Sequence, residues 1–159
     1  MAQAPETLRS VLIPLERTQI VLPNAAVAEV TAYVQPEPVE GTEDWLLGMV
    51  TWRGVRIPMV SYEALLGDQV PSDRRGVRMA VFYALSPNRK VDFIAVRVAE
   101  IPRLIRLDED SLHAAPSADE AATGVLRSVE IYGDTGLIPD LDGLEAAVAR
   151  QLTQAGVEV

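Results

Sequence analysis

Two residues suited to a specific protein contact stand side by side, Trp52 and Arg53, and Gly54 follows them. They belong to the segment 45–67, WLLGMVTWRGVRIPMVSYEALLG, which predicts a strand, a tight turn at Arg53-Gly54, a second strand and a short helix. Tryptophan and arginine are enriched among the residues that dominate the binding energy of protein interfaces. Because no catalytic side chain stands beside them, the segment predicts binding to another protein rather than catalysis.

The other side chains that could do chemistry form no recognisable catalytic or metal site. The single histidine, His113, lies in an acidic, Ala-rich segment without predictable partners for a hydrolase triad or a zinc site. The acidic runs at 108–110 and 140–142 lack the ligand spacing of a calcium loop, and Asp140 fits a helix N-cap. No nucleotide-binding loop or nucleophile elbow is present. Any two of the 23 acidic residues could meet as a glycosidase pair, but nothing selects a pair. We therefore predict no enzyme, no cofactor and no metal.

The composition predicts a core built from aliphatic residues. The chain has 159 residues, of which 48% are hydrophobic and only 5% aromatic, so Val, Leu, Ile and Ala must fill the interior. β-Branched residues favour strands. The formal net charge of −9 argues against nucleic acid, whose phosphates need a basic surface, and against an anionic membrane surface.

The absence of cysteine excludes disulfides, thiol nucleophiles and thiolate metal sites. The first ten residues, MAQAPETLRS, show no basic segment followed by an apolar run, so no signal peptide is predicted. No apolar stretch approaches the roughly 18 residues of a spanning helix. These features predict a soluble cytoplasmic protein.

The elements that must position Trp52 and Arg53 are short strands. Strands are predicted, in chain order, over 10–15, 18–22, 27–34, 49–52, 55–60, 77–85, 91–98, 101–107, 125–132 and 136–138. From Asp140 onward, apolar residues recur at helical spacing and predict a C-terminal helix, while 108–123 is predicted to be irregular. About ten short strands separated by turns indicate a mainly β protein, either a sandwich or closed barrels.

An internal repeat is visible in the order of several short motifs. The first-half motifs are Val27-Ala28-Glu29-Val30, Gly48, Arg53-Gly54 and Ile57-Pro58, and their counterparts, roughly 70 to 80 residues later, are Val98-Ala99-Glu100-Ile101, Gly124, Tyr132-Gly133 and Ile138-Pro139. The residues are common ones, so coincidence is the alternative. A true repeat predicts two similar small barrels packed together.

Segment 48–58 has the spacing G-x-x-x-x-R-G-x-x-x-P, and it is preceded by V-A-E-V at 27–30 and followed by L-L-G at 65–67. With these motifs in this order, and with its second half over 91–107 and 123–144, the chain resembles the CheW-like domain. That domain is the adaptor that couples chemoreceptors to the CheA histidine kinase.

The resemblance spans roughly residues 8–152 and implies one domain there, with flexible termini at 1–7 and 153–159. It implies two interleaved five-stranded β-barrels of the SH3-like or OB-like kind with a shared core. The C-terminal helix, over 140–154, is predicted to cover a barrel end. In the family, the first barrel docks on the kinase regulatory domain. A groove between the barrels holds the cytoplasmic tip of a methyl-accepting chemoreceptor.

The resemblance also implies protein-binding residues. Glu29 matches the functional glutamate of the family, and Arg53 matches its receptor-linked arginine, although a solvated turn residue is the alternative for Arg53. Val27, two positions from Glu29 on one strand face, would add an apolar anchor. Trp52 and Gly54 complete the predicted set. Trp52 could instead close a barrel end as a core residue, and Gly54 could serve the turn alone.

Two positions depart from the family pattern. Trp52 stands where the family usually has asparagine, and Ser61 stands where an acidic residue usually follows the second strand. These departures suggest a branch outside flagellar chemotaxis, such as the chemosensory systems of type IV pili and twitching motility.

The predicted function is that of a non-catalytic adaptor in a chemosensory array. Holding receptor and kinase together raises their effective concentration for each other, and head-to-tail contacts can close into rings. One alternative is a family member that binds receptor alone and acts as a spacer or brake. A second alternative is a small-ligand-binding β-barrel, which would show a deep polar cavity rather than a shallow apolar groove flanked by Glu29 and Arg53.

Overall fold

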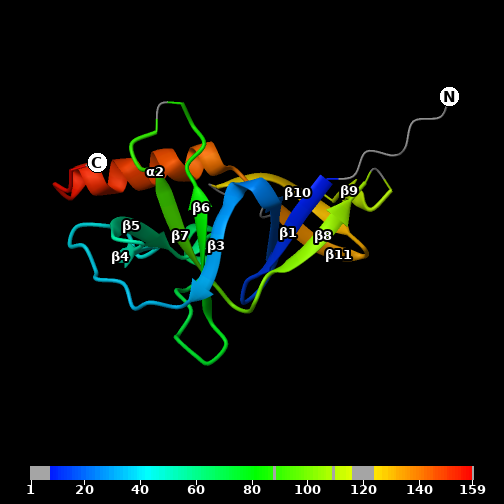
Figure 1. Cartoon of the computed structure of the whole chain (residues 1–159), viewed down its shortest axis with the longest axis horizontal. Coiled ribbons are helices and arrows are strands. Elements are labelled where there is room, and N and C mark those ends of the chain that lie inside the picture. The colour runs from blue at the N-terminus through cyan, green and yellow to red at the C-terminus, as the bar shows by residue number, and fades with distance from the viewer. Residues whose placement is uncertain (1–7, 88, 109, 116–123, 159) are drawn as a thin grey trace.

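The computed structural model describes residues 8–87, 89–108, 110–115 and 124–158, which form two sheets, three helical segments and their connections (Figure 1). The six-stranded sheet contains, in spatial order, β8 (Arg103–Leu107), β1 (Leu8–Pro14), β2 (Gln19–Pro23), β11 (Asp134–Pro139), β10 (Val125–Ile131) and β9 (Leu112–Ala114). The five-stranded sheet contains β3 (Val27–Ala32), β6 (Arg78–Tyr83), β7 (Phe93–Val98), β5 (Val55–Val60) and β4 (Leu46–Trp52). The helical segments are η1 (Asn24–Ala26), α1 (Tyr62–Leu65) and α2 (Leu141–Gln154). We call the two halves the β1 barrel and the β3 barrel.

The two barrels have the same topology, which confirms the predicted mainly β fold of two packed barrels. The order β8-β1-β2-β11-β10 in one sheet corresponds to β3-β6-β7-β5-β4 in the other. In both sheets the third and fourth strands pair in parallel, whereas the neighbouring pairs are antiparallel. The hairpin β1–β2 therefore joins strands of the second half of the chain, and β6–β7 joins strands of the first half. This exchange of hairpins makes the barrels interleaved.

The matching turns support the repeat at the level of single residues. Arg53 and Gly54 both have positive φ, 47° and 77°, and so do Tyr132 and Gly133, 48° and 86°. Positive φ at both central residues is the geometry that a two-residue hairpin turn requires. The turns between β4 and β5 and between β10 and β11 are thus equivalent, as predicted.

The proposed match between Val27-Ala28-Glu29-Val30 and Val98-Ala99-Glu100-Ile101 is wrong in the structure. Glu29 lies within β3, whereas Glu100 lies in the bend between β7 and β8. Val98 still belongs to β7, where it pairs with Arg78. Pro102 has no N–H group to donate to a ladder, and β8 begins only after it, at Arg103.

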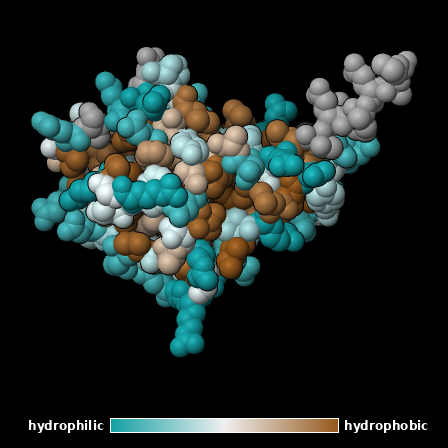
Figure 2. Space-filling model, viewed as in Figure 1, coloured by the Kyte–Doolittle hydropathy of each residue, from teal (hydrophilic) through white to brown (hydrophobic). Residues whose placement is uncertain are grey.

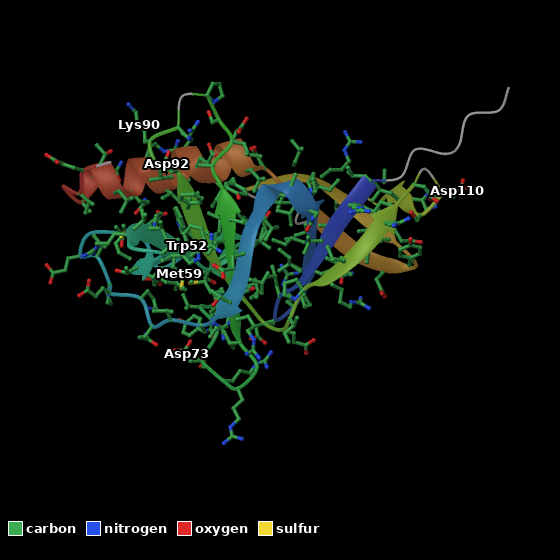
Figure 3. All side chains as sticks on the ribbon, viewed as in Figure 1. Trp52, Met59, Asp73, Lys90, Asp92 and Asp110 are labelled. Atoms are coloured by element: carbon green, nitrogen blue, oxygen red, sulfur yellow. The ribbon has the colours of Figure 1, made fainter. Side chains whose placement is uncertain are left out.

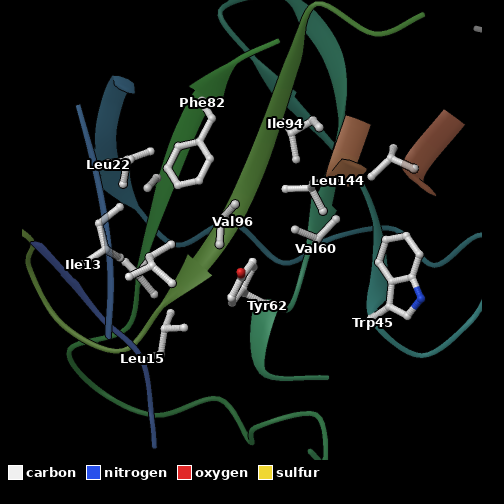
Figure 4. Packing of buried hydrophobic residues seen from close by; sticks show 14 of the residues in the cluster. Ile13, Leu15, Leu22, Trp45, Val60, Tyr62, Phe82, Ile94, Val96 and Leu144 are labelled. Carbon is white, nitrogen blue, oxygen red and sulfur yellow. The ribbon is translucent and has the colours of Figure 1, made fainter. Parts of the chain in front are cut away.

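Most of the core lies between the barrels. Its buried residues include Ile13, Leu22, Val60, Phe82, Val96 and Leu144 (Figure 4). Two smaller apolar clusters fill the barrel interiors, one around Met59 and Val81 and the other around Leu12 and Val129. Because alternate residues of a strand face opposite sides of a sheet, each barrel fills its own interior and shares its other face.

Helix α2 packs against the core between the barrels. Asp140 caps it by accepting a hydrogen bond from the Gly143 amide at 3.0 Å, as predicted for an N-cap. Leu144, Val148 and Leu152 recur at helical spacing and are buried, so they form the predicted apolar face. No helix within the described residues is long and apolar enough to cross a membrane.

Two details at the ends of elements differ from the predictions. The β1 barrel carries a sixth strand, β9, in a segment predicted to be irregular, because His113 pairs with Glu130 of β10 there. Helix α2 ends at Gln154, as predicted, but Val157 beyond it packs against the core. The predicted flexible residues 1–7 and 159 lie outside the described residues, and the flexibility of 153–158 stays a prediction.

Candidate functional site

Three predicted residues meet where the β3 barrel closes. Strands β3 and β4 are the two outer strands of the five-stranded sheet, and side chains bridge them. The Trp52 indole Nε1 donates a hydrogen bond to Glu29 Oε2 at 2.6 Å, and Arg53 Nε lies 3.4 Å from the same oxygen. The Arg53 guanidinium carbon stands 4.9 Å from the centre of the Trp52 ring, within cation–π range. We call Glu29, Trp52 and Arg53 the Glu29 cluster.

A bulge in β3 aims Glu29 into this cluster. In the ladder with β6, Val27 opposes Phe82 and Glu29 opposes Val81, so one residue of β3 is extra. Paired residues share a face of the sheet: Phe82 belongs to the core between the barrels, and Val81 belongs to the β3 barrel interior. A bulge re-aims the side chain that follows it. The prediction that Val27 shares a face with Glu29 is therefore wrong, and Val27 packs against the core between the barrels.

Trp52 is a core residue, which was the alternative to a surface role. It is 8% exposed, belongs to the apolar cluster inside the β3 barrel, and stacks at a tilt on Phe93 with ring centres 4.9 Å apart. Its indole N–H reaches the rim and holds Glu29. The position where the family usually has asparagine is thus occupied here by a buried hydrogen-bond donor, and a binding role for Trp52 stays a prediction.

Arg53 is the exposed member of the cluster. Its side chain is 65% exposed, compared with 34% for Glu29, so the ion pair between them contributes little to stability. Its guanidinium can still donate to acceptors of a partner. Gly54 has positive φ and no atoms near the position of a Cβ, which indicates a role in the turn. Binding roles for Val27, Glu29, Arg53 and Gly54 stay predictions.

The second departure from the family pattern has a local explanation. The Ser61 hydroxyl accepts a hydrogen bond from the Ala64 amide at 3.2 Å and caps the short helix α1. Serine and aspartate both serve well as N-caps because each offers a side-chain oxygen to the first turn. Ser61 can therefore do the capping that an acidic residue would do there.

A double-mutant cycle should detect the hydrogen bond inside the cluster. Trp52→Phe keeps an aromatic ring but removes the donor, and Glu29→Gln weakens the acceptor. We expect each change to lower the free energy of unfolding and the double mutant to lose about 1 kcal/mol less than the sum, because the two share one bond. Urea denaturation measures this coupling.

The control for that cycle pairs Glu29→Gln with Trp45→Phe. Trp45 Nε1 makes an equally short hydrogen bond, 2.6 Å, but to Glu43 rather than Glu29. Trp45→Phe and Glu29→Gln should therefore be additive. If the effects of Trp52→Phe and Glu29→Gln were also additive, the hydrogen bond between Trp52 and Glu29 would be contradicted.

An apolar surface lies over the junction of the barrels (Figure 2). A separate pocket of about 300 Å³, on strands β1 and β8 of the β1 barrel beside η1, is lined by Arg9, Asn24, Leu104, Ile105 and Arg106, and Leu104 is 74% exposed. Neither Glu29 nor Arg53 lines this pocket, so a groove flanked by these two residues stays a prediction. The sequence analysis missed these residues, although R-L-I-R-L at 103–107 places an exposed leucine between arginines.

The described residues contain no group of three or more His, Cys, Asp or Glu that could hold a metal ion. His113 is exposed on β9 opposite Glu130, beside a pocket that Asp108 and Tyr132 also line. Ser111 lines the same pocket, and its hydroxyl donates a hydrogen bond to the Asp108 carbonyl oxygen at 3.2 Å. The acidic run at 108–110 includes residue 109, which lies outside the described residues.

Comparison with known proteins agrees with this geometry. The family model described as the CheW-like domain matches residues 9–148. The solved structure of the scaffolding protein TtCheW from Thermoanaerobacter tengcongensis superimposes with a TM-score of 0.69 at 18% sequence identity, covering 86% of this chain and 90% of that one. A search of curated proteins gave no match. Because the family match spans most of the chain, the protein belongs to the CheW-like domain family.

Proposed function

We propose that the protein is a non-catalytic adaptor that links chemoreceptors to a CheA-type histidine kinase in the cytoplasm and controls kinase activity by scaffolding. The observation that carries this proposal is the Glu29 cluster. It presents a positioned Glu29 carboxylate and a largely exposed Arg53 guanidinium on the rim of the β3 barrel, and a buried Trp52 holds the carboxylate. Preorganised charges of this kind favour protein recognition. The scaffolding role of the structurally similar TtCheW supports the same proposal.

Two separate surfaces suit two partners. The Glu29 cluster bridges β3 and β4 of the β3 barrel, whereas the pocket around Leu104 lies on β1 and β8 of the other barrel and contains neither Glu29 nor Arg53. We assign the cluster to the kinase regulatory domain, which departs from the receptor link that the family resemblance implies for Arg53, and we assign the pocket around Leu104 to the receptor tip. Simultaneous occupation would raise the effective concentration of receptor and kinase for each other.

Calorimetric titration against the regulatory domain of a CheA-type kinase from the same organism tests the proposal. We expect Glu29→Ala and Arg53→Ala each to weaken binding about tenfold or more, because both remove charge at the centre of the proposed contact. Arg150→Ala, an exposed arginine on α2, is the matched control and should leave the affinity unchanged.

A second titration uses a cytoplasmic fragment of a receptor and the variant Leu104→Asp, which places a charge in the pocket around Leu104. The adaptor function is supported if Glu29→Ala and Arg53→Ala lose kinase binding and Leu104→Asp loses receptor binding. Receptor binding alone would favour the spacer or brake. Intrinsic phosphotransfer by the purified protein, or no binding to either partner, would contradict the proposal.

The assignment to a type IV pilus system stays a prediction that rests on Trp52 and Ser61. Both departures have structural roles within the chain, since Trp52 holds Glu29 and Ser61 caps α1. The partner titrations answer this question directly when receptors and kinases of the flagellar and pilus systems are compared side by side.

A further inference from the structure

A buried carboxyl group without a full set of hydrogen bonds lies in the wall of a pocket away from the Glu29 cluster. Glu63 of α1 is 2% exposed, and its Oε1 atom has no hydrogen-bond partner among the described residues. Its other oxygen is 3.5 Å from the Ser61 hydroxyl. Buried polar atoms are nearly always paired, so an unpaired carboxylate oxygen calls for an explanation. Glu63 lines a pocket of about 450 Å³.

The other charged side chains around this pocket are already paired. The pairs are Arg17 with Asp68 (2.7 Å), Arg74 with Glu16 (3.2 Å), and Arg97 with Glu16 (3.3 Å) and Asp73 (3.7 Å). Figure 3 shows Asp73 at the lower edge of the molecule, in the loop after α1. Glu63 is thus the acid of this group that has no cation within ion-pair distance among the described residues.

A buried carboxylate in the other helix shows what Glu63 lacks. Glu145 of α2 is also buried, and it faces the turn of the β6–β7 hairpin. Its two oxygens accept hydrogen bonds from the Leu85 and Ser86 amides, at 2.6 and 3.2 Å. Glu63 stands beside Glu16 in the turn of the equivalent hairpin, β1–β2. The Glu16 amide interacts with the Glu63 carboxylate, but Oε1 has no hydrogen-bond partner among the described residues, whereas both oxygens of Glu145 are paired.

We propose that this pocket binds a monovalent organic cation whose ammonium or guanidinium group donates to Glu63. A charged donor supplies the hydrogen bond that Oε1 lacks and the close ion pair that Glu63 does not make with any described residue. Val70 and Pro71 line the same pocket and can contact the carbon stem of such a cation. The inference is independent of kinase or receptor binding, since it uses other residues.

Binding should depend on pH through Glu63. Burial is the main cause that raises the pKa of Glu63 to about 7, and the nearby Glu16 carboxylate raises it further. The Arg97 charge and hydrogen bonds from the Glu16 amide and the Ser61 hydroxyl lower this pKa, but by less. The facing charges across the pocket are the paired Arg17, Asp68 and Arg74. A cation binds the ionised form, which is about ten times more abundant at pH 8 than at pH 6. Affinity should therefore rise about tenfold between these values.

The experiment follows backbone amide shifts of the full chain by NMR during titration with methylguanidinium and methylammonium chloride at constant ionic strength. Neutral methylurea, similar in shape to methylguanidinium, is the control ligand. N-acetyl-arginine amide tests whether the cation can be a protein side chain rather than a small molecule. We expect saturable shifts at Glu16, Glu63 and Gln69 with dissociation constants on the order of 1 mM, as for very small ligands.

Glu63→Gln removes the charge but keeps the shape, and it should weaken binding of the cations about tenfold or more at pH 8 and abolish the pH dependence. Glu130→Gln, an exposed residue of β10, makes the same change in net charge and should have no effect. Equal shifts with methylurea, a linear response without saturation, or unchanged binding in Glu63→Gln would overturn the proposal.

Discussion

Replacing Gly48 with alanine is expected to destabilise the protein by about 3 kcal/mol or more. A Cβ at this position would lie 2.1 Å from the Glu37 carbonyl oxygen and 2.5 Å from its carbon, closer than any real contact. Both are backbone atoms, so no side chain can rotate away. Gly48 also has φ of 142°, which L residues with a side chain rarely adopt. Urea denaturation followed by tryptophan fluorescence measures the loss.

The close approach at Gly48 is fixed by the neighbouring residue. The Glu37 amide donates to the Met49 carbonyl, and the Met49 amide donates to the Glu37 carbonyl, each at 2.9 Å. These bonds fasten the loop before β4 to the edge of that strand, which leads into Trp52 and Arg53. We therefore expect the Gly48→Ala variant to disturb the Glu29 cluster as well as the fold.

Gly54→Ala is the matched control for this effect. Gly54 also has positive φ, 77°, but a Cβ at this position would have no atom within 4 Å beyond its chain neighbours. Gly54→Ala should therefore lower the free energy of unfolding by only about 1–2 kcal/mol, which is the cost of a side chain in the left-handed backbone conformation. Equal losses in the two variants would show that backbone conformation, rather than the contact with Glu37, makes Gly48 necessary.

The sequence predicted the turns and helix caps, because these features depend on residues that are close together in the chain. The turn at Arg53-Gly54 follows from a two-residue connection between apolar runs, and the cap at Asp140 follows from its place before a periodic apolar face. The repeat was visible in sequence because equivalent turns need equivalent residues. The exchange of hairpins between barrels was not, since it depends on which strands pair across the chain.

The contacts that make the candidate site depend on long-range packing. Glu29 and Trp52 are 23 positions apart and meet only because β3 and β4 are the two outer strands of one closed barrel. The bulge before Glu29 inserts one residue into β3, and the V-A-E-V motif carries no signal for it. A bulge reverses the face of the sheet on which each following side chain lies. The regular alternation of a strand, which puts Val27 and Glu29 on one face, therefore gave the wrong face for Val27.

Glu63 could not be singled out from the sequence either. In Y-E-A-L-L-G it has the pattern of a solvent-facing glutamate in a short helix, and Arg97 lies in an apolar strand 34 positions later. Burial of both depends on the β1–β2 hairpin, which brings Glu16 against β7, 81 positions away in sequence. Only the assembled barrels create this charged group between α1, the hairpin turn and β7.

The free energy of unfolding should rise as the pH falls from 8 to 5, by up to about 3 kcal/mol from Glu63 alone. Burial raises the pKa of this carboxyl to about 7 in the folded state, compared with 4.5 for an unperturbed glutamate. Between these two values the folded protein holds a proton that the unfolded chain releases, so added protons favour folding. Above pH 7 both states are ionised, and the folded state bears the full cost of a buried charge.

Glu16 determines the pH below which the free energy of unfolding stops rising and begins to fall. Burial alone would raise its pKa, but hydrogen bonds from Arg74 and Arg97 and their charges lower it overall. The stability that Glu16 contributes is therefore present above pH 4.5 and is lost as the pH falls further, which places the maximum near pH 5. Urea denaturation at pH 5, 6, 7 and 8 tests both signs. Glu63→Gln should flatten the curve above pH 5, whereas Glu130→Gln should leave its shape unchanged; a wild-type curve that is flat from pH 5 to 8 would show that Glu63 is solvated rather than buried.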